Sequence, residues 1–398
     1  MNRGGGRWPR VFMMDLWATV PYYTAYLSRA LLERGVRLTV GSISYYLDPD
    51  CFSSRGLKVD PGLSDVVGKF PLSRAPRRVF KMLEAMLNLA ALTVRFLVSP
   101  PDVVHVQYLP MLQWRLPLDF WFLEFCRSRG VKIVLTVHDL LPHDSGAAYR
   151  QTFHKLYWRA DRIICHSEHV RARLGEEFCV LPEKISVVPH GPFFYDLPPG
   201  DGGQTLRQLQ IAPEDLVVLW QGIVFPYKGL DLLVEAWQSV QGSGVDATLV
   251  IAGTGTPELL EQVRQQVCRL GLRRVKLELR FISTEELVTL YRTAAIVVYP
   301  YREITTSGAL ATGLALGKTI VASDLPVFRE LLINRKNALL VDPHSSRELA
   351  EALLELIRDP ALRQQLAAQV GAMNFGDRSW ISIADKTIEA YGLALARP

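Results

Sequence analysis

Short apolar runs alternate with helical patterns along almost the whole 398-residue chain. In the first half these runs are "RVFMMDLW", "VRLTVGSI", "DVVHVQYL", "KIVLTVHD", "RIICHS" and "ISVVPHG". Strands this uniformly apolar are typical of parallel sheets, because helices cover both faces of such a sheet. The alternation therefore predicts an α/β fold built on parallel sheets.

The alternation is interrupted once, at "PFFYDLPPGDGGQ" (192–204), where prolines and glycines indicate a linker. It restarts with "DLVVLWQGI" (215–223) and continues through "ATLVIAGTG", "RFI" (280–282), "AAIVVYPY" and "TIVASD". A chain of this length exceeds one ordinary core. We expect two doubly wound, Rossmann-like domains, residues 1–198 and 199–376, followed by a separate helix in 377–398.

Positive charge is concentrated in the first half, where residues 1–198 hold 25 Lys and Arg against 18 Asp and Glu. The richest stretch is "RAPRRVFK" (74–81). The sequence has no helix-turn-helix, zinc or aromatic RNA-binding pattern, so no nucleic-acid partner is predicted and an anionic membrane surface is the remaining candidate.

An apolar stretch, residues 79–98, follows these basic residues and is long enough to span a bilayer. Four polar or charged side chains interrupt it: Lys81, Glu84, Asn88 and Arg95. A membrane-spanning helix rarely tolerates four such groups. We therefore expect an amphipathic helix that packs against the core and whose basic start can contact lipid.

The five cysteines are scattered and show neither a CxxC pair nor Cys/His ligand spacing. This pattern predicts reduced thiols in a cytoplasmic protein and no metal cluster.

A group of hydroxyls and one glycine lies between the run "AAIVVYPY" and the small-residue helix pattern "SGALATGLALG". Its members are Glu303, Thr305, Thr306, Ser307 and Gly308. The first amides of a helix lack partners and carry partial positive charge, so this stretch predicts an anion site at a helix start. The alternative is an ordinary Ser or Thr cap without a ligand.

Five stretches together resemble the retaining GT-B glycosyltransferases of family 4. They are "TVHDLLPH" (136–143), "VVPHGPF" (187–193), "VLWQGIVFPYKGLDLLVEA" (218–236), "FISTEELVTLYRTAAIVVYPY" (281–301) and "SGALATGLALGKTIVASDLPVFREL" (307–331). The resemblance implies two domains that face each other across a cleft. It also implies metal-independent transfer of a sugar from a UDP- or GDP-linked donor to a glycan or lipid-linked acceptor, in cell-surface polysaccharide assembly, without a cofactor.

The resemblance also implies roles for individual residues. The donor diphosphate would be held by Lys228 and the helix-start residues Thr306, Ser307, Gly308 and Ala309. His138 and Glu303 would contact the reacting sugar as catalytic residues, and the nucleotide would contact Gly222, Gly253, Ile282 and Thr312. For Lys228, Glu303 and His138 the alternatives are a solvated turn lysine, an exposed strand-end acid and a buried strand-end histidine. His105 and His143 are weaker candidates.

Two positions depart from the family pattern. Ile223 stands where members commonly carry an arginine, and Thr312 stands where the second of two paired glutamates is expected. The first glutamate would fall on Ile304, one place from Glu303. These departures keep open a non-catalytic nucleotide- or glycan-binding protein on the same fold. Two rival enzyme classes find less support, since "DPD" (48–50) is a poor DxD metal motif and an epimerase would need clustered acids and histidines.

The last helix pattern, "DRSWISIADKTIEAYGLAL" (377–395), has one apolar face, made by Trp380, Ile383, Ala384, Ile388, Tyr391 and Leu395. A short helix is marginal alone and must bury such a face. In GT-B enzymes this helix commonly crosses back to the first domain, and we expect the same here. The alternative is a helix that completes the second domain.

Overall fold

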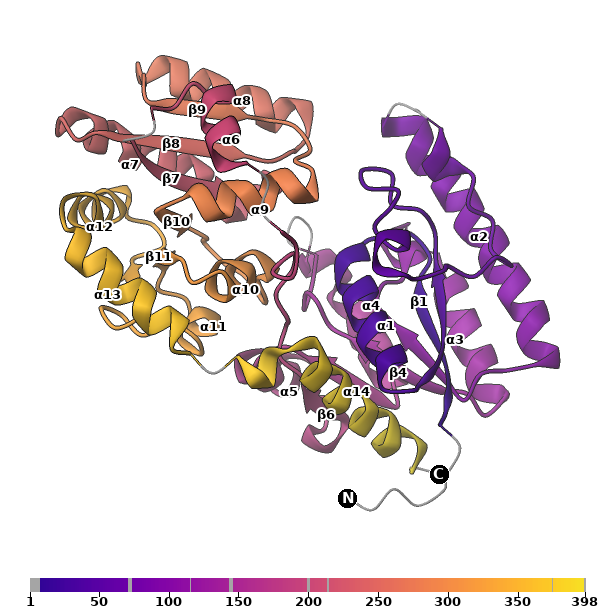
Figure 1. Ribbon diagram of the computed structural model, residues 1–398. Helices are drawn as coiled ribbons and strands as arrows, with labels where there is room; N and C mark the ends of the chain where they lie inside the picture. The colour runs from indigo at the N-terminus through magenta and orange to yellow at the C-terminus, as the bar shows by residue number, and fades with distance from the viewer. Residues whose placement is uncertain are drawn as a thin grey trace. The chain divides into compact units, whose positions relative to one another are not determined.

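The computed structural model describes residues 8–70, 74–114, 116–142, 146–198, 201–212, 215–373 and 375–396. The chain forms two compact units (Figure 1). Unit 1 comprises Met1–Pro189 and Gly376–Pro398, and unit 2 comprises His190–Phe375. Each unit contains one six-stranded sheet, and every strand pairing in both sheets is parallel. The predicted α/β fold of two doubly wound domains is confirmed.

The sheet of unit 1 has the strand order β2-β1-β3-β4-β5-β6. Its strands are β1 (Arg10–Asp15), β2 (Arg37–Ser42), β3 (Val103–Val106), β4 (Lys132–Thr136), β5 (Arg162–Cys165) and β6 (Ile185–Val187). Its helices are α1 (Pro21–Glu33), α2 (Arg74–Val98), α3 (Leu118–Ser128), α4 (Gly146–Arg159), α5 (Glu168–Phe178) and α14 (Trp380–Leu395). Short 3-10 helices are η1 (Ser53–Arg55), η2 (Val67–Lys69), η3 (Pro110–Trp114), η4 (Pro182–Lys184) and η6 (Gly376–Arg378).

Helices cover both faces of this sheet. Alternate residues of β1, β3 and β4, such as Phe12, Val104 and Ile133, form one core with α2, α3, α4 and α5. The residues between them face the opposite way, where α1 and α14 lie side by side (Figure 1). This two-sided burial explains why the strands read as continuous apolar runs.

The C-terminal helix packs on unit 1, as predicted, so the alternative that it completes the second domain is wrong. Trp380 stacks on Tyr26 with ring centres 5.3 Å apart, and it meets Tyr23 edge-on at the same distance. The Tyr391 hydroxyl lies 2.7 Å from Nδ1 of His105 on β3. Asp385 pairs with Arg34 just beyond α1. The chain end therefore completes the α1 face of the first sheet.

The sheet of unit 2 has the order β12-β11-β10-β7-β8-β9. Its strands are β7 (Leu216–Gln221), β8 (Ala247–Ala252), β9 (Val275–Glu278), β10 (Ile296–Tyr299), β11 (Thr319–Ser323) and β12 (Leu339–Val341). Its helices are α6 (Gly202–Gln208), η5 (Pro226–Lys228), α7 (Leu230–Gly242), α8 (Pro257–Arg269), α9 (Thr284–Thr293), α10 (Gly308–Ala315), α11 (Pro326–Arg329), α12 (Ser346–Arg358) and α13 (Pro360–Gly371). Helices α7, α8 and α12 share a core with one face of the sheet.

Two details of unit 2 differ from the sequence prediction. The strand expected at residues 280–282 lies earlier, at β9, and Arg280–Ile282 form the loop that leads to α9. The linker expected at 192–204 is shorter, because Asp201 caps α6 by accepting a hydrogen bond from Gln204 N. His190 and Phe193 already pack within unit 2, against Gly308, so this unit begins before the proline- and glycine-rich stretch.

Candidate functional site

Two glycines and a lysine converge at the C-terminal ends of β7 and β8. A Cβ atom on Gly253 would lie 1.8 Å from the carbonyl oxygen of Gly222, so the two backbones touch. A Cβ atom on Gly222 would lie 2.7 Å from Nζ of Lys228, which is half-buried in η5. Three of the predicted donor-binding residues are therefore brought together, at the sheet edge where ligands of open α/β sheets bind.

Tyr301 connects this lysine to the start of α10. Nζ of Lys228 lies 5.7 Å from the centre of the Tyr301 ring, and the Tyr301 hydroxyl is hydrogen-bonded to Ser307. Burial raises the pKa of Tyr301 above its ordinary value, despite the Ser307 bond, so the hydroxyl stays neutral. Sequence reasoning missed this residue, because "VVYPY" was interpreted only as the end of a strand.

Ser307 caps α10. Its Oγ accepts a hydrogen bond from Leu310 N at 3.1 Å. This is the ordinary cap that the sequence left open as an alternative. Within the described chain, the amides of Gly308 and Ala309 have no acceptor in the protein. An anion could therefore still bind at these two amides.

Two buried tyrosines anchor the first turn of α10. The carbonyl oxygen of Ala309 accepts hydrogen bonds from the hydroxyls of Tyr299 at 2.8 Å and Tyr291 at 3.2 Å. Tyr299 also contacts Gly313, where a Cβ atom would lie 2.4 Å from the tyrosine oxygen. These contacts fix the direction in which the helix start points, and no local sequence pattern signalled them.

Gly308 and Thr312 both pack against the segment that enters unit 2, residues 190–193. A Cβ atom on Gly308 would lie 2.5 Å from the Phe193 ring and 3.0 Å from His190, so this glycine makes room for two rings. Thr312 is buried, and its hydroxyl accepts from Phe193 N at 3.0 Å and donates to Gly308 O at 2.8 Å. This hydroxyl is therefore engaged inside the protein, and the predicted contact of Thr312 with the nucleotide stays a prediction.

The loop that carries Glu303 and Thr306 is anchored through its neighbour Arg302. The Arg302 guanidinium makes two hydrogen bonds to the Asp231 carboxylate, at 2.8 and 2.7 Å, and one to Pro226 O at 2.7 Å. Glu303 is exposed and Thr306 is half-buried. The structure thus gives Glu303 an exposed place beside the η5 turn, while its contact with a sugar remains a prediction.

The side chains of Ile223 and Ile282 offer no polar group for binding a nucleotide. Ile223 is 43% exposed in the loop after β7, which leaves that loop without the arginine that the family pattern predicts. Ile282 is buried, so only its backbone could meet a nucleotide.

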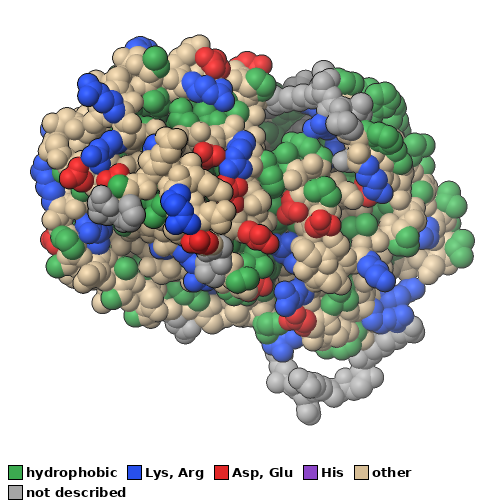
Figure 2. All heavy atoms as spheres, turned by 45° about the horizontal axis from the view of Figure 1, so that its top comes forward, with side chains coloured by type: hydrophobic (Ala, Val, Ile, Leu, Met, Phe, Trp, Pro, Cys, Tyr) green, Lys and Arg blue, Asp and Glu red, His purple; other side chains and the backbone are tan. Residues whose placement is uncertain are grey.

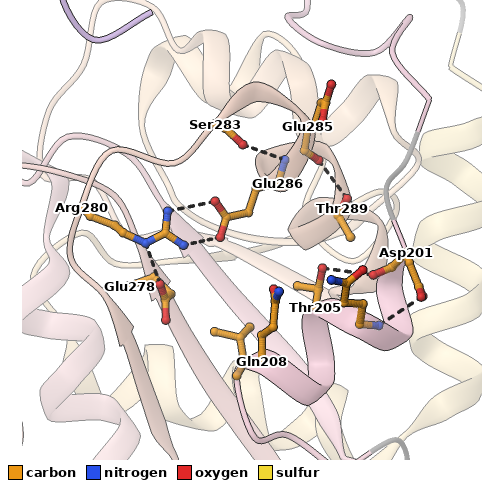
Figure 3. Close-up of a pocket in the computed structure, with 11 residues that line it drawn as sticks. Asp201, Thr205, Gln208, Glu278, Arg280, Ser283, Glu285, Glu286 and Thr289 are labelled. Atoms are coloured by element: carbon orange, nitrogen blue, oxygen red, sulfur yellow. Dashed lines mark hydrogen bonds and ion pairs between the residues drawn. The ribbon is translucent and has the colours of Figure 1, made fainter.

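A polar pocket of 560 Å³ lies between α6, the end of β9 and the start of α9 (Figure 3). It contains none of the predicted site residues. Figure 3 shows Arg280 between Glu278 and Glu286, and the guanidinium hydrogen-bonds with both carboxylates, at 3.0 and 2.9 Å. The pocket lining holds four carboxylates, Asp201, Glu278, Glu285 and Glu286, against the single cation Arg280. This negative lining would repel a diphosphate, so we do not assign the donor to this pocket.

His138, the catalytic candidate of unit 1, follows β4 and belongs to a polar cluster. Its Nε2 lies 2.9 Å from Oε1 of Gln107, and its Nδ1 lies 3.4 Å from Nε2 of His166. The Tyr23 ring meets it edge-on, with ring centres 4.8 Å apart. These partners hold the imidazole in one orientation. Its predicted contact with sugar remains untested, and His143 lies outside the described residues.

His105 has a structural role. It is buried in β3, with Nδ1 bonded to Tyr391 and Nε2 2.7 Å from the Thr136 hydroxyl. Burial lowers the pKa of His105 to about 3. Burial likewise lowers the pKa of His166 to about 4, although its hydrogen bond to Val188 O acts the other way. Both histidines are therefore neutral in the folded protein near pH 7.

The neutral state of these histidines predicts an acid-sensitive unit 1. The folded pKa of each lies below the unfolded value near 6.5, so the unfolded chain binds more protons as pH falls. Between pH 7.5 and pH 5 each should cost unit 1 about 2 kcal/mol of unfolding free energy. In His105→Gln, the loss of stability that His105 causes between these pH values should disappear, and the loss that His166 causes should remain. Amide hydrogen exchange of β3 and β4 at both pH values measures it.

The pH dependence of the wild type alone is not enough, because titration of Asp119 changes the stability of unit 1 in the opposite direction. Burial raises the pKa of its carboxyl to about 7, so protonation of Asp119 stabilises the folded state as pH falls. The exposed His344 is the matched control, and His344→Gln should keep the full pH dependence of the wild type. If the gap between wild type and His105→Gln is the same at both pH values, His105 is not neutral in the folded state.

Three general features bear on the chemistry of the chain. Among the described residues, no three His, Cys, Asp or Glu side chains gather as ligands for a metal ion. No helix in the described ranges combines the length and the apolar character needed to cross a membrane. The five cysteines are free thiols.

Two protein families match the chain over most of its length. "Glycosyltransferase Family 4" matches residues 20–191, and "Glycosyl transferases group 1" matches residues 215–359. Among similar proteins, a D-inositol 3-phosphate glycosyltransferase of Actinosynnema mirum is 26% identical, over 94% of this chain and 91% of its own. A second, from Catenulispora acidiphila, is 28% identical over 68% of both chains.

Solved structures share the fold. The Anabaena protein HepE, crystallised with UDP and glucose, superposes with a TM-score of 0.74 at 18% identity, over 96% of this chain and 99% of its own. A glycosyltransferase from Rickettsia africae superposes with a TM-score of 0.73 at 16% identity, over 98% of this chain and 100% of its own. The fold, the two family matches and the full-length relatives agree, and the chain belongs to the GT-B glycosyltransferases of family 4, group 1.

Proposed function

We propose that this enzyme transfers a sugar from a UDP- or GDP-linked donor to a glycan or lipid-linked acceptor, with retention of configuration and without a metal ion. We further propose that it acts in cell-surface polysaccharide assembly, on the cytoplasmic side of a membrane to which it binds peripherally.

The observation that carries the proposal is the convergence of Lys228, Tyr301 and the start of α10 in unit 2. When the sugar leaves, negative charge develops on the diphosphate oxygen. One ammonium group, a neutral hydroxyl and the amides of Gly308 and Ala309 are the groups that stabilise such charge. They also supply a reason why the diphosphate would need no metal ion.

Retention follows from a step that requires no protein nucleophile. The acceptor hydroxyl would attack the anomeric carbon on the face from which the diphosphate departs. Its proton would pass to the departing phosphate oxygen. In this proposal Glu303 accepts hydrogen bonds from hydroxyls of the transferred sugar, and His138 contacts the sugar or the acceptor. The hydrogen bond between His138 and Gln107 would keep the imidazole in place.

The comparisons support two choices of substrate for the assay. HepE has been crystallised with UDP-glucose, which makes UDP-sugars the first donors to try. The relatives are named for transfer to D-inositol 3-phosphate, so that compound belongs in the acceptor panel beside lipid-linked and free glycans. The donor panel is UDP, GDP, ADP and their sugars, tested by thermal shift and then by transfer in the presence of EDTA.

Replacing Lys228 by alanine tests the site directly. We expect Lys228→Ala to weaken binding of the preferred nucleoside diphosphate by about 1.5–3 kcal/mol, the usual contribution of a charged hydrogen bond. That loss corresponds to roughly ten- to hundredfold in Kd. Isothermal titration of wild type and variant measures it, and transfer activity should fall at least as far.

Lys336 is the matched control, since it is an exposed lysine of the same unit. Lys336→Ala should leave the Kd unchanged, and both variants should keep the wild-type thermal midpoint. An unaltered Kd in Lys228→Ala would remove Lys228 from the diphosphate site. Binding without any transfer across the donor and acceptor panel would contradict the proposed reaction and leave the site intact.

A further inference from the structure

Helix α2 presents an unexpected face to solvent. From Val79 to its end at Val98, every exposed residue of α2 is apolar: Val79, Phe80, Leu83, Leu87, Ala90, Ala91, Val94, Leu97 and Val98. Leu87 and Val94 are each 65% exposed and Val98 is 86% exposed. Residues 80, 83, 87, 90, 94 and 97 are spaced by three or four, so they form one stripe along the helix. We call these nine residues the α2 stripe.

The polar side chains of α2 are turned inward. Glu84 accepts hydrogen bonds from the amides of Val66 at 2.6 Å and Val67 at 3.2 Å, and Asn88 bonds both Ser64 N and Ser64 O. Lys81 donates to Trp17 O at 3.1 Å. These bonds bind α2 to neighbouring loops of its own unit. The side chains that argued against a membrane-spanning helix thus have internal partners, and the outer face is left apolar.

The stripe is too large to be an ordinary scatter of surface hydrophobics. Isolated exposed apolar residues are normal, whereas a continuous apolar patch indicates a binding surface. Figure 2 shows hydrophobic side chains gathered along the edge of unit 1 where α2 lies. Val66 and Phe70, in the segment before α2, are also more than half exposed. The apolar surface therefore extends beyond the helix itself.

The charge beside the stripe is positive. Residues 66–98 contain six Lys and Arg and one acidic residue, Glu84, which is buried. Arg78 is exposed and lies 5.4 Å from the centre of the Trp114 ring, and Arg77 lies 4.6 Å from that of Tyr46. An apolar helix face beside basic side chains matches a membrane interface, where acyl chains lie beneath anionic headgroups.

We propose that the α2 stripe inserts into the interface of an anionic lipid membrane, with Arg77 and Arg78 contacting the headgroups. This attachment surface rests on the peripheral membrane binding proposed above and names the residues that make it, and it does not depend on the donor site. The sequence prediction of contact through the basic start alone is thereby extended, because the lipid-facing residues run along the helix to Val98. The prediction that α2 packs against the core is confirmed for its inner face, where Ala85, Leu89, Leu92 and Phe96 belong to the core of unit 1.

Vesicle flotation of the full chain tests this surface. Wild type should float with vesicles of phosphatidylglycerol and phosphatidylcholine at low salt, and should bind pure phosphatidylcholine vesicles at least tenfold less. The double variant Leu87→Glu/Val94→Glu should lose at least tenfold in partitioning. Arg77→Ser/Arg78→Ser should lose about fivefold for each basic residue and should lose most of its salt dependence.

Leu181→Glu is the matched control, because Leu181 is an exposed leucine of unit 1 outside α2. It should bind vesicles as wild type does, and all variants should keep the wild-type Kd for the nucleoside diphosphate. The proposal is overturned if wild type does not float, or if Leu87→Glu/Val94→Glu floats as well as Leu181→Glu. It is also overturned if wild type is a dimer that ignores vesicles and becomes a monomer in the stripe variant.

Discussion

Trp380→Ala should destabilise unit 1 by about 3–5 kcal/mol, the usual cost of removing a buried tryptophan side chain. Trp380 is buried at the first position of α14, where it stacks on Tyr26 and meets Tyr23. Alanine would leave a cavity between α14 and α1. Because Tyr23 also packs against His138, the loss should extend to the polar cluster at the ends of β4 and β5.

The measurement is amide hydrogen exchange or urea unfolding of unit 1, with Leu393→Ala as the control. Leu393 belongs to the same helix but is exposed, so its truncation should change stability by no more than about 0.5 kcal/mol. Equal effects of the two substitutions would mean that α14 does not contribute its apolar face to unit 1. Nucleoside diphosphate binding in unit 2 should stay unchanged in both variants, which separates loss of unit 1 from loss of the donor site.

The fold could be predicted from the sequence because its signals are local. Parallel strands that are buried on both faces appear as apolar runs, and the helices between them show a period near 3.6. The final helix could be placed because an apolar face on a short helix must be buried. The sequence prediction misplaced the strand β9 because its residues, "VKLE" (275–278), alternate apolar and charged side chains and form no apolar run. This strand lies at the edge of its sheet and is only half-buried.

The donor site could be predicted only in part. Lys228 and the α10 start are visible as a strand–turn–helix pattern, but Tyr301 becomes a member only through its long-range contact with Lys228. The partners of His138 likewise follow other strands of the sheet: Gln107 comes directly after β3 and His166 directly after β5. Such pairs depend on the strand order of the sheet, which a single sequence does not contain.

The outer face of α2 shows a different limit. The sequence showed that polar residues interrupt this helix but not which way they point, and the loop at residues 64–67 supplies amides that hydrogen-bond Glu84 and Asn88 on the inner side. Burial of these two side chains leaves the apolar residues of the α2 stripe on the outer face. A hydrophobic period identifies the helix, but only the position of the hydrogen-bond partners decides which side meets solvent.

Gly229→Ala should disrupt unit 2 far more than the same substitution at a glycine of positive φ that has open space around it. Gly229 ends the turn of Lys228 with a φ of 62°, and a Cβ atom there would lie 1.8 Å from the carbonyl oxygen of Pro300. That neighbour is backbone, so no rotamer change relieves the overlap. Nearby, Arg302 N donates to Tyr227 O at 2.7 Å and the Arg302 side chain holds Asp231, so the two segments resist separation.

Gly271→Ala is the matched control, because Gly271 has a φ of 61° and a Cβ atom there meets nothing within 4 Å. It should cost only the left-handed backbone penalty of about 1–2 kcal/mol. Gly229→Ala should cost at least about 2 kcal/mol more, as expected for overlap with a fixed backbone atom. Because that overlap forces Lys228 away from Tyr301, it should also weaken nucleoside diphosphate binding, whereas Gly271→Ala should not. Urea unfolding of unit 2 and isothermal titration measure both effects, and equal costs at the two glycines would show that the Pro300 contact does not constrain the turn.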